Sequence, residues 1–248
     1  MNKEYLINVI NLDERSDRWQ LIENDFGKYP ELTLKRFSAI QSKEGWRGCS
    51  LSHVQLIKQA YHDKLPYTIV MEDDSTIVNQ KLFSAKFIEI CNYLENNSSE
   101  WDVFSMCSTY SNEGNNDNVI LVDKKLGLFF YQFGKTTNFM IYNQSSYEKI
   151  LSLEKIFLDP TSKEKMHTID VVMGRIGLRF LTKIPFLCVQ RNGFSDITQS
   201  NDSYLSAYKA NEQYLLKLSM KNLGWLGRLK IIGLKIKLLL GKVQYGRL

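Results

Sequence analysis

The chain has 248 residues, enough for one large domain or two small ones. Hydrophobic residues make up 44%, charged residues 24% and aromatic residues 12%, a composition that excludes disordered and collagen-like proteins. The four cysteines are widely spaced and form no C-x-x-C pair, so neither a zinc site nor a disulfide framework is predicted, and we expect reduced thiols.

The net charge of +5 is unevenly distributed along the chain. Residues 217–248 contain eight Lys or Arg and no Asp or Glu, whereas residues 1–216 contain 24 basic and 27 acidic side chains. The basic character therefore belongs to a C-terminal tail, and such asymmetry indicates an anionic partner surface for that tail.

The predicted elements alternate between strands and helices over the first 110 residues. Strands are expected at 5–10, 32–37, 67–71, 102–107, 119–122, 126–133, 137–142 and 180–189, the last with Pro185 inside it. Helices are expected at 17–28, 52–60, 83–94, 147–153 and 169–176, and residues 108–118 are expected to form a loop. This order predicts an α/β fold with a mixed, mainly parallel central sheet.

An acidic cluster follows the third predicted strand. Glu72, Asp73 and Asp74 come directly after the apolar run 67–71. In an open α/β sheet ligands bind at the carboxyl ends of the strands, and carboxylate oxygens there suit Mg²⁺ or Mn²⁺. The alternative is that the cluster caps a helix or faces water.

A polar segment, 11–19, follows the first predicted strand and leads into a helix. Backbone N–H groups at such a helix start can hold a nucleotide, and Arg15 and Arg18 can make bidentate contacts to phosphate. The alternative is that Asp17 caps the helix and both arginines are solvated.

The segment 48–53, Gly-Cys-Ser-Leu-Ser-His, is expected at a helix start. Gly48 permits a close backbone approach, and Ser50 or Ser52 can cap the helix. His53 is a candidate for contact with a phosphate, a sugar hydroxyl or the acidic cluster. A Cys49 nucleophile is conceivable, although a buried cysteine is the more common case.

These three segments, in this order, resemble the signature of glycosyltransferase family 25. Weaker similarity continues at 37–40, 101–103, 136–141 and 169–170, so that the resemblance spans roughly residues 4–200. Trp46-Arg47 and Phe139 depart from the usual pattern. The resemblance implies a GT-A type nucleotide-sugar-binding fold, a UDP-sugar donor and transfer with inversion.

The resemblance also assigns expected roles to residues. The expected metal ligands for Mn²⁺ or Mg²⁺ are Asp74 and Glu72, which would neutralise the charge that grows on the leaving UDP. Inversion requires a carboxylate base, with Asp170 as first candidate and Asp196 and Asp102 behind it. The expected donor-binding residues are Asn11, Leu12, Arg15, Arg18, Ala39, Gly48, Ser52, His53 and Asp73.

Residues 217–248 are predicted to be a separate tail behind a catalytic domain of residues 1–216. From Trp225 to Leu240 apolar residues recur at helical spacing between basic ones, which predicts a basic amphipathic helix for an anionic membrane surface. The alternative is a helix packed on the domain. No nucleic-acid motif is present in the sequence, and nucleic-acid binding is not expected.

The expected function is transfer of a hexose, galactose before glucose, to a lipooligosaccharide, LPS or other surface glycan. The start of the sequence resembles no signal peptide, and no uncharged apolar stretch approaches the roughly 20 residues of a membrane span. We therefore expect a cytoplasmic protein, peripheral on the inner face of the bacterial cytoplasmic membrane. The competing hypotheses are a non-catalytic membrane-associated scaffold and a nucleotidyltransferase.

Overall fold

The computed structural model describes residues 3–110, 119–131, 134–195, 200–202 and 205–221. Its main sheet has eight strands. In spatial order they are β2 (Leu32–Ser38), β1 (Tyr5–Asn11), β3 (Tyr67–Glu72), β10 (Phe139–Asn143), β5 (Val103–Ser105), β11 (Phe180–Lys183), β8 (Leu128–Tyr131) and β7 (Ile120–Asp123). Only β10 and β8 run against the other strands of this sheet. The predicted mixed, mainly parallel sheet is confirmed.

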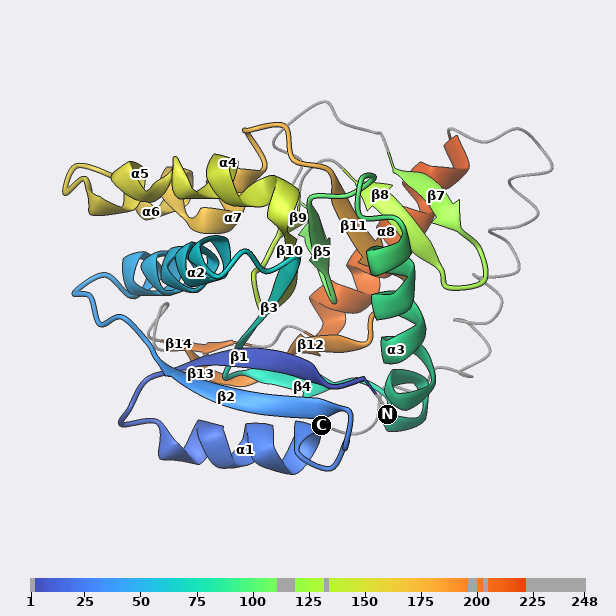
Figure 1. The fold of residues 1–248 in the computed structure, drawn as a ribbon, viewed down its shortest axis with the longest axis horizontal. Helices are drawn as coiled ribbons and strands as arrows, with labels where there is room; N and C mark the ends of the chain where they lie inside the picture. The colour runs from blue at the N-terminus through green and yellow to red at the C-terminus, as the bar shows by residue number, and fades with distance from the viewer. Residues whose placement is uncertain (1–2, 111–118, 132–133, 196–199, 203–204, 222–248) are drawn as a thin grey trace.

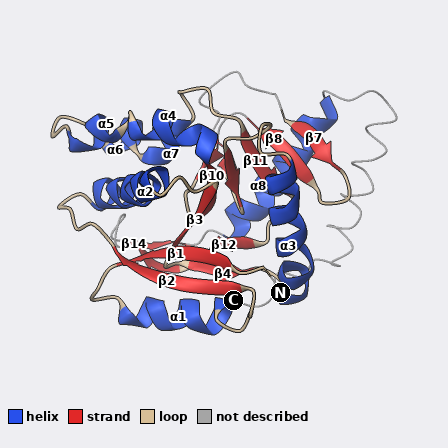
Figure 2. Ribbon diagram, in the orientation of Figure 1, coloured by secondary structure: helices blue, strands red, loops and turns tan. Residues whose placement is uncertain are grey.

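Helices cover both faces of this sheet (Figures 1 and 2). They are α1 (Ser16–Phe26), α2 (Gly45–His62), α3 (Gln80–Asn96), α4 (Tyr147–Leu151), α5 (Glu154–Leu158), α6 (Glu164–His167), α7 (Ile169–Met173) and α8 (Leu205–Lys221). A 3₁₀ turn, Gln144–Ser146, precedes α4. Three small ladders complete the fold: β4 (Ser75–Ile77) with β12 (Cys188–Gln190), β6 (Thr109–Tyr110) with β9 (Gly134–Lys135), and β13 (Gly193–Ser195) with β14 (Ser200–Asp202).

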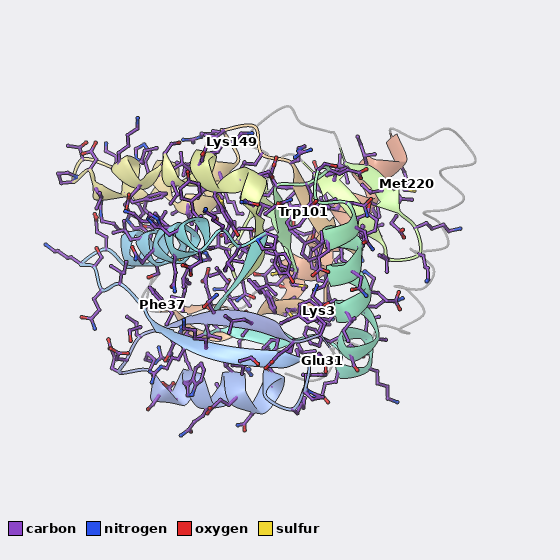
Figure 3. The ribbon with its side chains drawn as sticks, viewed as in Figure 1. Lys3, Glu31, Phe37, Trp101, Lys149 and Met220 are labelled. Carbon is purple, nitrogen blue, oxygen red and sulfur yellow. The ribbon has the colours of Figure 1, made fainter. Side chains whose placement is uncertain are left out.

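The strand period of two residues divides the core into two layers. On β3, Ile69 and Met71 pack with the buried side chains of α1 and α3, whereas Val70 packs with those of α2, α4 and α8. In Figure 3 Trp101 lies in the interior of the molecule and Lys149 lies on the outer side of α4. Because both faces are covered, the central strands are apolar on both sides.

Several element boundaries differ from those expected. Helix α2 begins at Gly45, seven residues before the expected start at residue 52. The expected strand 180–189 is two strands, β11 and β12, which belong to different sheets. The expected loop 108–118 contains β6, and its residues 111–118 lie outside the described part.

The predicted division at residue 216 falls within α8. Leu218 in this helix is 1% exposed and belongs to the core with Leu215 and Leu216. The packed body therefore continues to the end of α8. The amphipathic helix expected at 225–240 lies outside the described residues, so the tail stays a prediction.

Candidate functional site

The register of the sheet brings the three predicted segments to one edge. Asn11 pairs with Ser38, and Ile10 pairs with Glu72, so β1, β2 and β3 end side by side. A cavity of about 350 Å³ opens there. Its walls come from residues 10–18, from residues 39–49, from the acidic cluster and from Gln190. The three segments therefore converge on one edge of the sheet.

A segment just before β10 holds two of the three carboxylates. The Thr137 hydroxyl donates to Glu72 Oε1 at 2.6 Å, and the Asn138 side-chain amide donates to Asp74 Oδ1 at 2.7 Å. The Glu72 N–H in turn donates to the Asn138 carbonyl at 2.8 Å. The other oxygen of Asp74 accepts a hydrogen bond of 2.8 Å from Gln190. These donors are neutral, so they orient the carboxylates without cancelling their charge.

Asp73 faces a different set of partners. Its carboxylate accepts a hydrogen bond of 2.7 Å from Asn11 and forms an ion pair of 2.8 Å with Arg18. Arg36 donates to the side-chain oxygen of Asn11 at 2.7 Å, which fixes the orientation of that amide. Asp73 and Arg18 nevertheless both line the cavity. Asp73 therefore ties the loop after β1 to the loop after β3.

The electrostatics of the cluster differ from one carboxyl group to the next. Burial, reinforced by Glu72 and Asp73, raises the pKa of Asp74 to about 7. Burial also raises the pKa of Asp73, although Arg18 and Asn11 oppose this. For Glu72 burial again raises the pKa, but His53 and the hydrogen bonds from Thr137 outweigh it, and the net shift is downward. Asp74 thus carries the least compensated charge of the three.

The first turns of α2 pack tightly against the loop after β2. A Cβ atom on Gly48 would lie 2.3 Å from the Ile40 carbonyl oxygen, so a side chain cannot be placed there without moving the loop. Ser52 accepts a hydrogen bond of 2.8 Å from the Ile40 N–H and donates to the Gly48 carbonyl. Ser52 lies inside the helix, not at its start, so its expected capping role is wrong. The same holds for Ser50, which donates to Trp46.

His53 is completely buried between two partners. Its Nε2 lies 3.4 Å from Glu72 Oε1, and its Nδ1 lies 3.0 Å from the Tyr142 hydroxyl. It does not line the cavity, and it acts on the acidic cluster through Glu72. Burial, with Glu72 and Asp170 nearby, raises the pKa of the Cys49 thiol well above its ordinary value. This environment disfavours a thiolate nucleophile.

Asp170, the first candidate base, lies in the first turn of α7. It accepts hydrogen bonds from the Thr136 N–H at 2.9 Å and from the Val171 N–H at 2.8 Å, and also one from the Thr168 hydroxyl. Thr136 adopts a φ of 92°, a region that residues with side chains rarely enter. Asp170 is close enough to influence the Cys49 thiol, but it does not line the cavity.

The other two candidate bases lie elsewhere. Asp102 precedes β5 and therefore lies at the amino edge of the sheet, opposite the cavity. Its side chain is 3% exposed and pairs with Arg179 at 3.0 Å. Burial opposes ionisation, but the hydrogen bonds from Arg179 and Ser145 lower the pKa of Asp102 to about 2. This is the geometry of a structural ion pair. Asp196 lies outside the described residues.

A second cavity, of about 160 Å³, adjoins the first and is rich in arginine. It shares Asp73, Asp74 and Gln190 with the first cavity. Three arginines line it: Arg15, Arg18 and Arg191. Arg15 also forms an ion pair with Asp17 at 2.9 Å. Arg191 pairs with Asp25 at 2.8 Å, and its buried Nε has no hydrogen-bond partner.

Four polar residues at this edge were not expected from the sequence as site residues. They are Thr137, Asn138, Gln190 and Arg191. Thr137 and Asn138 lie in the predicted strand 137–142 and in the weakly similar segment 136–141, which could have indicated them, whereas Gln190 and Arg191 only follow the predicted strand 180–189. Of the expected donor-binding residues, Leu12, Arg18, Ala39 and Asp73 line the larger cavity, and Arg15 lines the smaller one. The other four expected residues do not line either cavity but lie behind its walls: Asn11, Gly48, Ser52 and His53.

The donor set fits a hard divalent cation. Glu72 and Asp74 supply carboxylate oxygens beside a cavity, which is the ligand type that Mg²⁺ and Mn²⁺ prefer. The raised pKa of Asp74 reports uncompensated negative charge that a cation would neutralise. Asp73, held by Arg18 and Asn11, is the least available of the three carboxylates.

Comparison with solved structures supports the α/β architecture. A glycosyltransferase involved in the glycosylation of the major capsid of PBCV-1 aligns with a TM-score of 0.50 and 10% identity, over 86% of this chain and 98% of that chain. The glycosyltransferase GlyE of Streptococcus pneumoniae TIGR4 aligns with a TM-score of 0.43 and 8% identity, over 98% of this chain and 65% of that chain. At 10% identity the likeness to the first of these concerns the fold alone.

No curated protein matches the chain in sequence. The sequence model of glycosyltransferase family 25, described as an LPS biosynthesis protein, matches residues 44–157. This range contains α2, the acidic cluster and the segment that holds it. The resemblance drawn from the motifs is therefore confirmed over residues 44–157, and this match supports a glycosyltransferase role.

Proposed function

We propose that the chain is a metal-dependent, inverting glycosyltransferase that moves a hexose from a UDP-sugar to a hydroxyl of a surface glycan. The observation that carries the proposal is the position of Glu72 and Asp74 beside a cavity of about 350 Å³, within the segment that matches the family. Galactose is favoured over glucose as the sugar. The family's description as an LPS biosynthesis protein supports a lipooligosaccharide or LPS acceptor.

The two adjoining cavities suit different parts of such a donor, in which the diphosphate links the nucleoside to the sugar. The larger cavity has both polar and apolar walls and suits the nucleoside. The smaller cavity is lined by Arg15, Arg18 and Arg191, which can bind a diphosphate through bidentate contacts. Arg18, which lines both cavities, joins the two halves of the site.

Glu72 and Asp74 are the residues that would hold Mn²⁺ or Mg²⁺. When bound, the ion supplies charge neutralisation for the leaving UDP. Thr137, Asn138 and Gln190 keep the two carboxylates oriented, so little reorganisation is needed during the reaction.

Asp170 is the candidate base that would take the proton of the acceptor hydroxyl. Hydrogen bonds from Thr136, Thr168 and Val171 fix its carboxylate on the same side of the sheet as Cys49 and Glu72. A base acts only within hydrogen-bond reach of the hydroxyl, so the acceptor must approach over α7. Replacing Asp170 by Asn is expected to lower kcat about 100-fold or more with little effect on donor binding.

The test is product analysis with a panel of UDP-sugars and Mn²⁺. A hexosyltransferase releases UDP, and with a suitable acceptor it forms a glycoside of inverted anomeric configuration. A nucleotidyltransferase would instead release pyrophosphate, and a non-catalytic scaffold would release neither. Absence of UDP release with every UDP-hexose, in protein that is folded and loaded with Mn²⁺, would contradict the proposal.

We further propose that residues 222–248 attach the enzyme to the anionic inner face of the cytoplasmic membrane. Among the helices in the described part of the chain, none combines the length and hydropathy needed to cross a bilayer. A flotation assay with anionic liposomes should compare the full chain with residues 1–221, because a cut at 216 would remove the buried Leu218. We expect only the full chain to float, and equal flotation of both forms would contradict this role.

A further inference from the structure

Cys49, His53 and Glu72 form a cluster of metal-binding side chains beside the cavity. The sulfur, a ring nitrogen and a carboxylate oxygen all lie within 4.8 Å of one another. Among the residues that the structure describes, this is the only group of three or more Cys, His, Asp or Glu side chains with that spacing. The ligands are of mixed type, one sulfur, one nitrogen and one oxygen, which is unlike the all-oxygen pair of Glu72 and Asp74.

The local structure explains why these atoms meet. Cys49 and His53 are four residues apart on α2, so they project from the same face of the helix. That face is directed toward the carboxyl end of β3, where Glu72 lies 3.4 Å from His53 Nε2. The spacing needs little adjustment, because ligand atoms around a tetrahedral zinc ion, with bonds of about 2.0–2.3 Å, are roughly 3.4–3.8 Å apart.

The surroundings of the cluster are those of a metal-binding histidine. A ligating imidazole usually directs its second ring nitrogen to a hydrogen-bond partner that fixes its orientation. The Tyr142 hydroxyl occupies that place, 3.0 Å from His53 Nδ1. The Thr137 hydroxyl similarly holds the Glu72 carboxylate.

The cluster is also accessible from one side. His53 is completely buried, but Cys49 and Glu72 both line the cavity of about 350 Å³. An ion can therefore enter from the cavity, and a water molecule there can complete a four-coordinate site.

We propose that Cys49, His53 and Glu72 form a binding site for a soft divalent cation of the Zn²⁺ type. A single thiolate with imidazole and carboxylate selects Zn²⁺ over Mn²⁺ and Mg²⁺, which favour oxygen ligands. Binding forms the zinc–sulfur bond as the thiol proton leaves for solvent, and His53 donates through Nδ1 to Tyr142 while Nε2 binds the ion. The site was not expected from cysteine spacing, because only one of its ligands is a cysteine.

One consequence rests on the proposed transferase function. A Zn²⁺ ion at this site takes up Glu72, which is also a proposed ligand of the catalytic cation. Zn²⁺ is therefore expected to inhibit sugar transfer by the wild-type protein, and Cys49→Ser is expected to remove most of this inhibition. If the protein transfers no sugar, this consequence fails with the proposed function, but the site itself is tested independently by spectroscopy.

The decisive experiment uses Co²⁺ as a spectroscopic substitute for Zn²⁺. Titration of the metal-free full chain with Co²⁺ should give an intense sulfur-to-cobalt charge-transfer band, which added Zn²⁺ abolishes. Cys49→Ser should lack the band and bind Zn²⁺ at least about 100-fold more weakly, since even loss of a supporting residue costs 10–100-fold. Cys91→Ala is the matched control, because Cys91 is buried in α3, away from this cluster, and should keep the band.

X-ray absorption of the zinc-loaded wild-type protein gives a second readout that needs no variant. One sulfur ligand at about 2.3 Å, with nitrogen and oxygen ligands at about 2.0–2.2 Å, is expected. Absence of the cobalt band, persistence of the band in Cys49→Ser, or a zinc shell without sulfur would each overturn the proposal.

Discussion

At the amino edge of the central sheet Asp102 is buried beside Arg179, whereas at the carboxyl edge Asp74 is buried beside two further carboxylates. The guanidinium outweighs the effect of burial at the first position and lowers the pKa of Asp102 to about 2. Burial and the neighbouring negative charges raise the pKa of Asp74 to about 7. The sheet thus carries a neutralised carboxylate at one edge and an uncompensated cluster of carboxylates at the other. A cation that binds at the second edge would neutralise the most negative charge.

The sharpest way to test this contrast is to remove one charge at each edge. We expect Asp74→Asn to reduce sugar transfer at least about 100-fold, because the amide keeps the shape but removes an anionic ligand of the catalytic cation. Asp102→Asn should leave transfer within a few-fold of wild type at temperatures where the variant is folded. The measurement is the initial rate of UDP release with Mn²⁺. A similar loss of UDP release in both variants would contradict the proposed difference between the two edges.

The order of the two variants should reverse when stability is measured, with Asp102→Asn now the more strongly affected. Asp102→Asn is expected to lower the free energy of unfolding by about 1–3 kcal/mol, because Arg179 loses its charged partner; a fully buried pair would contribute more, but solvent screens Arg179, which is 46% exposed. The folded-state pKa lies below the ordinary 3.8, so this stabilisation is present above pH 4 and disappears as the pH falls through about 2. Urea unfolding at pH 7 and pH 2.5 measures it, and an equal effect at both pH values would be inconsistent with an ion pair.

At the carboxyl edge the backbone itself can be perturbed without changing a charge. Gly48→Ala places a methyl group against the Ile40 carbonyl and must displace the loop 39–43, which lines the cavity. We expect a loss of about 1–2 kcal/mol in stability and a rise of roughly tenfold in the KM for the donor. Ala60→Ser, a substitution in a later turn of the same helix, is the control and should leave that KM unchanged. An unaltered KM in Gly48→Ala would show that the loop does not shape donor binding.

The pH dependence of stability in the metal-free protein adds a further prediction, and its sign is diagnostic. The folded-state pKa of Asp74 is raised above 3.8 to about 7, so the folded state binds more protons than the unfolded state between these values. Burial of Asp74 therefore costs no stability at pH 4 and progressively more as the pH rises through 7. In buffer with EDTA, Asp74→Asn should match wild type at pH 4 and exceed it in stability at pH 8. The reverse order at pH 8 would mean that a cationic partner already compensates Asp74.

Much of the carboxyl edge could be predicted because its signals are local. The polar residues after 5–10 and the acidic residues after 67–71 each follow an apolar run, and parallel strands bring such ends together. The position of Asp102 illustrates the limit of this reasoning, because an acidic residue that precedes a strand lies at the opposite edge from one that follows it. Attention to strand direction alone would have separated Asp102 from the site.

The remaining site residues depend on contacts that the sequence does not encode locally. Asn138 precedes β10, which runs against β3, and only this reversed direction brings its amide to Asp74. Gln190 reaches the same carboxylate from β12, 116 residues further along the chain. The early start of α2 was not predicted because Ser50 and Ser52 favoured a later helix start as capping residues, whereas both lie inside the helix and Gly48 allows the close approach to Ile40.

The most direct test of the proposed site is a crystal structure of the protein soaked with Mn²⁺ and UDP, with anomalous diffraction used to locate the metal. We expect one manganese peak within coordination distance of the Glu72 and Asp74 carboxylates, bridging them to the diphosphate of the nucleotide. A nucleotide bound elsewhere, or a manganese ion with neither carboxylate among its ligands, would contradict the central claim.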